Sequence, residues 1–448
     1  MDEELRKDSK YIIDASLKAV MHGEAVKRAL LDFRPGKGKT ILISVGKAAF
    51  SMAEAAVTFL NAEDTCSDYE HDNNIESIHR KGRISDGIVI TKYGHVCGDI
   101  PGIRCFEAGH PVPDENGFKA TQEVLDLVSD LTDGDTVLFL LSGGGSALFE
   151  KTLISPYELM SITRQLLASG ADITEVNTIR KRLSAVKGGR FARTCSPAKV
   201  FQIVLSDIVG DPLDMIASGP ACADMSTCSD AREIAEKYGL RLSDTAERFL
   251  AVETVKKLDN VETHITGSVR ELCRAAEGAC RSLGYETVFL ADRLSCEAKD
   301  AGIFISDIVK TYEDYEGFER CDNCGECDKK LAFIAGGETV VHLNEERSGL
   351  GGRNQELALA AAEGISGVKG SCVFSVGSDG TDGPTDAAGG YVDHSTMADA
   401  ERLGVDIPEA LRLHDSYHAL ESLGGLMITG PTGTNVNDVT IALMNQGK

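Results

Sequence analysis

The chain has 448 residues, of which 42% are hydrophobic and 26% are charged, and its formal net charge is −24. This length exceeds what one hydrophobic core usually supports, so we expect two domains. The charge disfavours nucleic acid and anionic lipid as partners, and no apolar run approaches the roughly 20 residues that span a bilayer. The charged start after Met1 lacks the apolar core of a signal peptide, so the sequence predicts a cytoplasmic protein.

The first part of the chain alternates helices with short apolar strands. Residues 11–31 carry apolar residues at helical spacing and predict a leading helix. Strands are then predicted at 40–45, 87–91, 136–141 and 200–205. Such strands, separated by helices, are typical of a parallel sheet covered on both faces. The sequence therefore predicts an α/β first domain with a doubly wound, Rossmann-like sheet.

Lys47 directly follows the first predicted strand, within Val45-Gly46-Lys47-Ala48-Ala49, and opens a helix of small residues. A lysine at this position could reach a phosphate as a point charge. A solvated surface lysine is the alternative, and the position alone does not separate the two.

A glycine cluster follows the strand at 136–141. It contains Ser142, Gly143, Gly144, Gly145 and Ser146 and leads into a predicted helix. Free N–H groups and a helix dipole at such a turn favour an anion, so we interpret the loop as a phosphate cradle for a nucleotide. A tight turn that only packs helix on strand is the alternative. The loop lacks both the Walker sequence and the spaced glycines of the dinucleotide fingerprint.

Residues 177–190 form a basic segment in an acidic protein. On a helix, Lys181 and Ser184 share one face, and Lys187 falls near the glycine-marked end. This stripe suits an anionic substrate or nucleotide phosphate, and we assign Lys187 to the nucleotide; a solvated charged face is the alternative. Asp207 then follows the strand at 200–205, where a carboxylate could hold Mg²⁺ or accept a hydroxyl proton.

The second domain is predicted to begin near Asp259, giving residues 1–258 and 259–448, with the first helix able to dock on the other domain. Further strands are predicted at 287–290, 331–335, 340–343, 372–377 and 425–429. This part has fewer helices per strand, so we expect a mixed sheet.

Cys321, Cys324 and Cys327 lie in a polar, acidic stretch between two of these strands. Their two-residue gaps could bring three thiolates onto zinc or an iron–sulfur cluster, with His342 completing the set. We favour a loop with redox-sensitive thiols and keep the peripheral metal site as the alternative. Most of the other cysteines stand singly in apolar patterns, as expected for reduced core thiols.

Three polar residues of the second domain lie beside glycine clusters. Glu338 follows Gly336-Gly337, and we assign it to the nucleotide. Arg353 would occupy the first turn of a helix, where a positive side chain opposes the helix dipole and an anion would offset the conflict. Asp379 follows a strand within a segment that has three carboxylates, and its spacing does not fit a calcium loop.

Five segments, in order along the chain, carry a recognisable pattern. They are Ser142-Gly143-Gly144-Gly145-Ser146-Ala147-Leu148, Leu183-Ser184-Ala185-Val186-Lys187-Gly188-Gly189, Ser206-Asp207-Ile208-Val209-Gly210-Asp211, Gly351-Gly352-Arg353-Asn354-Gln355-Glu356 and Ser378-Asp379-Gly380-Thr381-Asp382-Gly383-Pro384-Thr385-Asp386. Together they resemble the glycerate 2-kinase family with a MOFRL C-terminal domain. The resemblance spans nearly the whole chain, and the cysteine stretch at 321–327 is not part of the family pattern and looks like a local insertion.

The resemblance implies dependence on ATP and Mg²⁺, D-glycerate as acceptor and 2-phosphoglycerate as product, at a cleft between a Rossmann-like domain and a mixed α/β domain. In the family, the residues at the positions of Lys47 and Arg353 are the usual candidates for essential groups. We expect these two side chains to clamp the transferring phosphoryl group, while Asp207 or Asp379 binds Mg²⁺ or takes the hydroxyl proton. Hydroxypyruvate reductase and a non-catalytic nucleotide-binding module are the alternatives. A homo-oligomer is left open.

Overall fold

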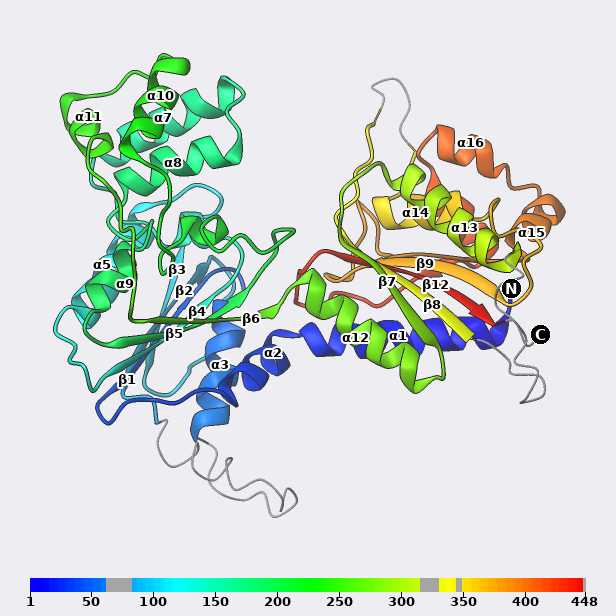
Figure 1. The fold of residues 1–448 in the computed structure, drawn as a ribbon, viewed down its shortest axis with the longest axis horizontal. Coiled ribbons are helices and arrows are strands. Elements are labelled where there is room, and N and C mark those ends of the chain that lie inside the picture. Colours follow the sequence, from blue (N-terminus) through cyan, green and yellow to red (C-terminus); the bar gives the residue numbers. More distant parts are fainter. Residues whose placement is uncertain (62–82, 315–329, 344–348, 446–448) are drawn as a thin grey trace. The chain divides into compact units, whose positions relative to one another are not determined.

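A computed structural model describes residues 1–61, 83–314, 330–343 and 349–445 (Figure 1). The chain divides into two compact units. The first, here called the parallel-sheet unit, comprises His22–Ser206 and Asp211–Thr266. The second, the mixed-sheet unit, comprises Met1–Met21, Asp207–Gly210 and Gly267–Lys448. Among the described residues, no helix is long and apolar enough to cross a membrane.

The sheet of the parallel-sheet unit has the strand order β3-β2-β1-β4-β5-β6. Its strands are β1 (Thr40–Val45), β2 (Asp86–Lys92), β3 (Ile103–Ala108), β4 (Thr136–Leu141), β5 (Lys199–Leu205) and β6 (Val261–Gly267). The four pairings that join β3 to β5 through β2, β1 and β4 are parallel. This is the doubly wound arrangement expected from the sequence, and the predicted fold class is confirmed.

Helices cover both faces of this sheet (Figure 1). Leu138 and Leu140 of β4 share a core cluster with α2 and α3, whereas the intervening Phe139 packs against Phe191 of α9, with the ring centroids 4.7 Å apart and the rings tilted by 49°. The helices of the sheet layers are α2 (His22–Leu30), α3 (Ala49–Asn61), α5 (Glu115–Val128), α6 (Gly145–Leu148) and α9 (Arg190–Cys195).

Four more helices of this unit gather beside the sheet around a smaller core of their own (Figure 1). They are α7 (Pro156–Ala168), α8 (Ile173–Leu183), α10 (Cys228–Lys237) and α11 (Asp244–Leu250). The 3₁₀ turn η1 (Ile216–Ser218) precedes α10 in the chain.

The mixed-sheet unit has the strand order β11-β10-β9-β12-β8-β7. Its strands are β7 (Glu286–Leu294), β8 (Lys330–Gly337), β9 (Ser371–Gly377), β10 (Gly389–Asp393), β11 (Leu426–Met427) and β12 (Asp438–Asn445). Among these described strands, the β7–β8 pair is parallel and the other four pairings are antiparallel. The predicted mixed sheet is therefore confirmed.

Helices lie on both faces of the mixed sheet as well. On one face, α1 (Glu3–Val20) and α12 (Val269–Ser282) share a core with alternate residues of β8, β9 and β12. The other face is covered by α13 (Ala298–Asp314), α14 (Arg353–Ala361), α15 (Thr396–Leu403), α16 (Ile407–Arg412) and α17 (Ser416–Leu423).

Some elements differ from the expectation. The helix predicted at 11–31 is divided into α1 and α2 at Met21, and α1 belongs to the mixed-sheet unit. The units separate at Thr266 and Gly267 rather than near Asp259, because β6 extends the parallel sheet beyond that position. The strand predicted at 340–343 is wrong, since only Val340 forms an isolated bridge, with Glu297.

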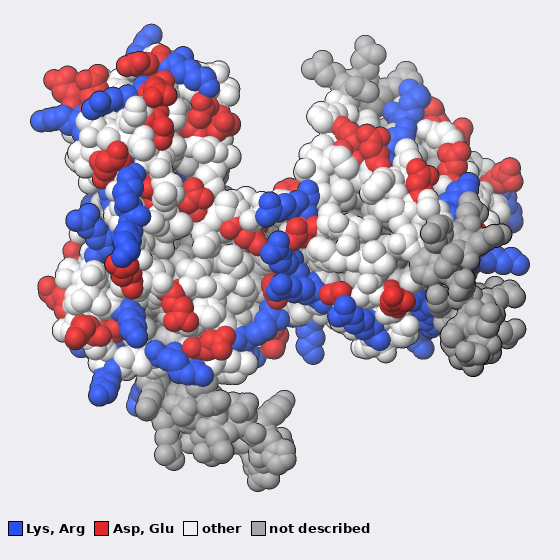
Figure 2. Space-filling view, in the orientation of Figure 1, with Lys and Arg blue, Asp and Glu red and all other residues white. Residues whose placement is uncertain are grey.

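Figure 2 shows acidic and basic side chains lying beside one another on the visible face of each unit. The formal charge of −24 is therefore not gathered into one continuous acidic surface on this face.

Candidate functional site

The segments that follow β1 and β4 meet at the point where the sheet reverses its winding. β1 and β4 are neighbours, and the chain leaves β1 toward β2 on one side and β4 toward β5 on the other. The backbone N–H of Lys47 donates to the carbonyl of Gly143 at 2.8 Å, and that of Ala48 donates to Ser142 Oγ at 3.1 Å. Ligands of doubly wound sheets bind at this switch point.

Glycines allow these two loops to approach closely. Gly46 has φ 125°, and a Cβ there would collide with Ser142. Gly144 has φ 87°, and a Cβ there would lie 3.1 Å from both Lys47 Cγ and His110 Cδ2. The N–H groups of Gly143 and Gly144 donate to no acceptor in the described part of the chain. Because α6 has only four residues, an anion here would depend on loop N–H groups more than on a helix dipole.

Lys47 is exposed, and no carboxylate of the described residues lies within ion-pair distance of its ammonium group. Its carbonyl oxygen faces His95 Nδ1 at 3.1 Å. The backbone of Lys47 is thus fixed while its charge is available, as binding of an anion requires.

The two serines of the glycine loop differ in role. Ser142 is buried, and its hydroxyl accepts from Ala48 N and lies 3.4 Å from the carbonyl of Val45, so it ties the two loops together. Ser146 is half-buried, and its hydroxyl lies 3.5 Å from that of Ser218. Of the two, Ser146 has the hydroxyl that can still turn toward a ligand.

Lys187 lies beneath the loop rather than on its open side. Its fully buried ammonium group donates to the carbonyls of Ser146 at 2.9 Å and Phe149 at 3.1 Å, and pairs with Glu150 at 3.1 Å. Burial lowers the pKa of Lys187, although Glu150 opposes the shift. All three ammonium protons have protein acceptors, so in this structure Lys187 supports the glycine loop and has no donor left for a nucleotide.

The rest of the basic segment is also mainly internal. Lys181 bridges Asp214 and Asp224 at 3.2 and 3.3 Å, and the buried Arg182 donates to Thr178 and Ser226. Both side chains are therefore paired inside the protein, and they form neither a solvated face nor an open anion site. They hold α8 against the loop that precedes α10.

In the mixed-sheet unit, Arg353 is held by two carboxylates. Its Nε and Nη2 donate to the two oxygens of Asp438 at 2.6 and 3.1 Å, and its Nη1 donates to Glu338 at 2.9 Å. Burial raises the pKa of Asp438 to about 6, although Arg353 opposes the shift. Glu338, expected at the nucleotide, therefore contacts Arg353.

The first turn of α14 has an acidic cap supplied from another loop. The N-cap Gly352 has no side chain, and the buried Asp382 accepts from Asn354 N at 3.1 Å and Gln355 N at 2.8 Å. Burial raises the pKa of Asp382. The protein's own carboxylates thus offset the placement of Arg353 at a helix N-terminus, and no bound anion is needed to explain it.

Arg353 lines a pocket of about 420 Å³ whose wall also contains Asp379, Asp382, Glu356 and His414. Glu356 is buried, and its Oε2 lies 2.9 Å from His414 Nδ1. Asp379 is half-buried and accepts from Thr381 N at 3.0 Å. A cation and several carboxylates at one pocket suit a phosphorylated ligand with its metal ion.

The metal predictions concern residues of the mixed-sheet unit. Asp207 and Asp379 both belong to it and are both half-buried. Mg²⁺ needs only one or two protein carboxylates beside phosphate and water, so such aspartates fit it. Within the described ranges, no three His, Cys, Asp or Glu side chains converge as a metal cluster. Cys321, Cys324 and Cys327 lie outside the described residues, and His342 is hydrogen-bonded to Glu297.

Similarity to known proteins extends over nearly the whole chain. Residues 8–251 match a family described as a domain of unknown function, DUF4147, and residues 331–438 match the MOFRL family. The D-glycerate 2-kinase of Thermotoga maritima is 46% identical over 444 residues, which is 99% of each chain. A crystal structure of glycerate kinase from that organism superposes with a TM-score of 0.86, at 46% identity, over 99% of this chain and 100% of the other. The chain belongs to the MOFRL-type glycerate 2-kinase family.

Family members also carry another name. A putative hydroxypyruvate reductase of Agrobacterium vitis is 36% identical over 91% of this chain and 100% of its own length. A reductase would need a site for a nicotinamide dinucleotide. In this member of the glycerate 2-kinase family, the loops after β1 and β4 lack the spaced glycines of a dinucleotide fingerprint.

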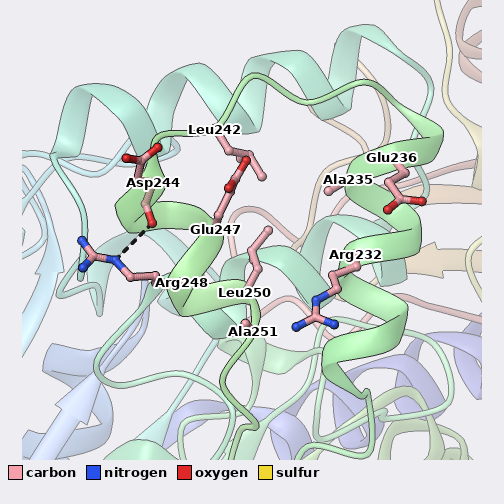
Figure 3. Close-up of a pocket in the computed structure, with 9 residues that line it drawn as sticks. All are labelled: Arg232, Ala235, Glu236, Leu242, Asp244, Glu247, Arg248, Leu250 and Ala251. Atoms are coloured by element: carbon pink, nitrogen blue, oxygen red, sulfur yellow. Dashed lines mark hydrogen bonds between the residues drawn. The ribbon is translucent and has the colours of Figure 1, made fainter.

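A larger pocket of about 680 Å³ lies away from the predicted site residues, between α10 and α11 (Figure 3). Arg232 and Arg248 lie at its wall with Glu236, Asp244 and Glu247. Arg248 donates to the carbonyl of Asp244 at 3.2 Å. None of the predicted site residues lines this pocket, so it is not assigned to ATP or glycerate.

Sequence reasoning missed several residues beside the candidate site. Asp438, which fixes Arg353, lies at the start of β12, a strand that was not predicted. Ser218 and Asn177 contact each other below the glycine loop, and His110 lies beside Gly144. The sequence did contain a signal for Asp438, which is a carboxylate at the start of the apolar run of β12. The contact between Asn177 and Ser218 has no such local signal, because it forms only in the folded chain.

Proposed function

We propose that the chain transfers the γ-phosphoryl group of ATP to the 2-hydroxyl of D-glycerate in an Mg²⁺-dependent reaction. The full-length similarity to the Thermotoga maritima enzyme carries this proposal. The glycine loop at the switch point of the sheet and the exposed Lys47 beside it supply the groups that phosphoryl transfer needs.

The residues have distinct proposed roles. The N–H groups of the loop Ser142–Ser146 and the ammonium group of Lys47 bind phosphate oxygens, while Arg353 neutralises charge on the transferring group. Asp207 and Asp379 hold Mg²⁺ or accept the proton of the glycerate hydroxyl, without a ranking between them. When bound, Mg²⁺ supplies positive charge to the β- and γ-phosphates.

The decisive assay offers both chemistries to one preparation. With ATP, Mg²⁺ and D-glycerate, phosphorus NMR is expected to show 2-phosphoglycerate and ADP. Hydroxypyruvate with NADH is expected to give no NADH oxidation. Oxidation of NADH without phosphoglycerate would instead establish a reductase, and ATP binding without either product would establish a non-catalytic nucleotide-binding protein.

The Arg353–Asp438 pair predicts a dependence on pH. Because the pKa of Asp438 is about 6, acidification through that value protonates the carboxylate and removes the ionic partner of Arg353. The value of kcat/KM for ATP should fall as pH drops through about 6, since this ratio reports groups of the free enzyme. Asp438→Asn should have low activity at neutral pH, and its kcat/KM for ATP should show no further fall as pH drops through about 6.

Unfolding provides a second measurement of the same titration. The pKa of Asp438 exceeds its ordinary 3.8, so the native state binds this proton more tightly than the unfolded chain. The wild type should therefore lose free energy of unfolding relative to Asp438→Asn as pH rises from about 4 to about 7. A constant difference between the two proteins over this range would contradict the assignment.

We also place the chain in the cytoplasm. Nine cysteines of the described residues are free, and four of them are buried, which suits a reducing compartment. The assembly state, including a homo-oligomer, is a matter for sedimentation measurements.

A further inference from the structure

A chain of polar side chains runs from the glycine loop into the interior of the parallel-sheet unit. Ser146 Oγ lies 3.5 Å from Ser218 Oγ, and Ser218 donates to Asn177 Oδ1 at 2.9 Å. The amide nitrogen of Asn177 contacts Met215 Sδ at 3.4 Å. Ser218 and Asn177 are buried, whereas Ser146 is half-buried at the open end of this chain.

The hydrogen-bond directions determine what Ser146 can do. A hydroxyl has one proton, and Ser218 gives its proton to Asn177 Oδ1, which can only accept. Ser218 can therefore offer Ser146 only a lone pair, at 3.5 Å, the outer limit of a hydrogen bond. This contact orients the O–H group of Ser146 but is a weak hydrogen bond, so Ser146 can donate the same proton to a stronger acceptor as well.

The backbone of Ser146 is fixed independently. Its carbonyl accepts from the buried Lys187 at 2.9 Å. A Cβ at the preceding Gly145 would approach Ala217 Cβ to 2.7 Å, so the loop packs directly against the turn that contains Ser218. Ser146 is thus held at its carbonyl by one buried side chain and at its hydroxyl by another.

The turn that supplies Ser218 has an unfavourable backbone. Ala217 and Ser218 have φ of 51° and 60°, a region that residues other than glycine rarely adopt. Such conformations persist only where the surroundings impose them, and they are concentrated at functional sites. Here the strained turn delivers the Ser218 hydroxyl to Ser146.

We propose that Ser218 and Asn177 are positioning residues that present the Ser146 hydroxyl as a donor to a nucleotide phosphate. This inference rests on the proposed function of the glycine loop as the phosphate site. A phosphate oxygen is negatively charged, so Ser146 donates to it more strongly than to the neutral Ser218. Ser218 Oγ remains the weaker acceptor of the same proton in a three-centre hydrogen bond, which keeps the Ser146 hydroxyl turned toward the phosphate. The hydroxyl stays on Ser146 throughout, and no covalent step is involved.

A double-mutant cycle tests the proposal. Ser146→Ala and Ser218→Ala are each expected to weaken binding of a non-hydrolysable ATP analogue by roughly fivefold to tenfold, measured by calorimetry with Mg²⁺. In the Ser146→Ala background, Ser218→Ala should have little further effect, because its only role at the phosphate runs through Ser146. Losses that multiply would overturn the inference.

Thr178→Ala is the matched control. Thr178 neighbours Asn177 on α8 and is buried, and its hydroxyl donates to the carbonyl of Thr174 within the same helix at 2.9 Å. It should bind the analogue like the wild type, and a Ser218→Ala protein that behaves identically to it would contradict the proposal. Because the cycle measures nucleotide binding, it remains decisive even for a protein that forms no phosphoglycerate, an outcome that contradicts only the proposed function.

Ser218→Gly separates the hydroxyl from the backbone strain. Glycine adopts φ of 60° readily, so Ser218→Gly should have a higher Tm than Ser218→Ala. Both variants lack the hydroxyl and should bind the analogue equally weakly. Wild-type affinity in Ser218→Gly would show that the backbone shape alone matters and would overturn the positioning role.

Discussion

Lys47→Ala is expected to lower kcat by roughly a hundredfold or more, with a smaller change in the KM for D-glycerate. The ammonium group of Lys47 is exposed beside the glycine loop, while its backbone is anchored to Gly143 at 2.8 Å. Charge on the phosphoryl oxygens is redistributed in the transition state, so a cation that meets it there contributes mainly to kcat. Steady-state kinetics with ATP and D-glycerate measure both constants.

Lys39→Ala is the control for this variant. Lys39 is also exposed and lies just before the same strand, β1, at its opposite end. Its removal should leave both kinetic constants near those of the wild type. Near-normal turnover in Lys47→Ala, together with an unchanged Tm, would exclude Lys47 from the chemistry while leaving the family membership untouched.

Arg353→Lys is expected to lower kcat by roughly tenfold or more, although it preserves the charge. A guanidinium group has five N–H donors, and three hydrogen bonds to Asp438 and Glu338 leave two of them for a ligand. A lysine ammonium group has three donors on one atom, so it cannot bind both oxygens of Asp438 and also present a planar pair to phosphate. The loss should appear in kcat/KM for ATP as well.

Arg412→Lys provides the matched comparison. Arg412 binds Glu409 through Nε and Nη2, with the same two-point geometry, on the exposed helix α16. Its replacement should alter neither kinetics nor fold. Equal activity of the two lysine variants would show that the planar guanidinium group of Arg353 has no role beyond its charge.

The architecture was predictable because its signals are local. β1, β4 and β5 are short apolar runs whose residues are almost all buried, and each is followed by a polar or glycine-rich turn. The order of residues alone therefore locates the loops at the carboxyl edge of the sheet. That Lys47 would lie against Gly143 could not be read from the sequence, since it depends on β1 and β4 becoming neighbours.

The basic segment shows the opposite case. Lys181, Arg182 and Lys187 gave a charge pattern that fitted a ligand site or a solvated face, yet all three are buried in ion pairs. Their partners Asp224 and Glu150 lie 43 residues after Lys181 and 37 residues before Lys187 in the chain, counted from their numbers. Pairing over such distances is a property of the tertiary fold, and helix spacing alone does not reveal it. The roles of the site residues therefore remain predictions.

The placement of α1 has a consequence for the order in which the chain is made. The ribosome releases α1 before the residues that cover its apolar side. This side includes Leu5, Ile12 and Ile13, and it packs mainly against α12 and also against β9. Closing this contact joins segments about 250 or more residues apart, and an isolated helix of this length is marginal in water. The parallel-sheet unit can fold once Thr266 has emerged. The apolar side of α1 therefore stays uncovered until α12, and then β9, have emerged, and a chaperone that binds exposed apolar helices would protect it during that time.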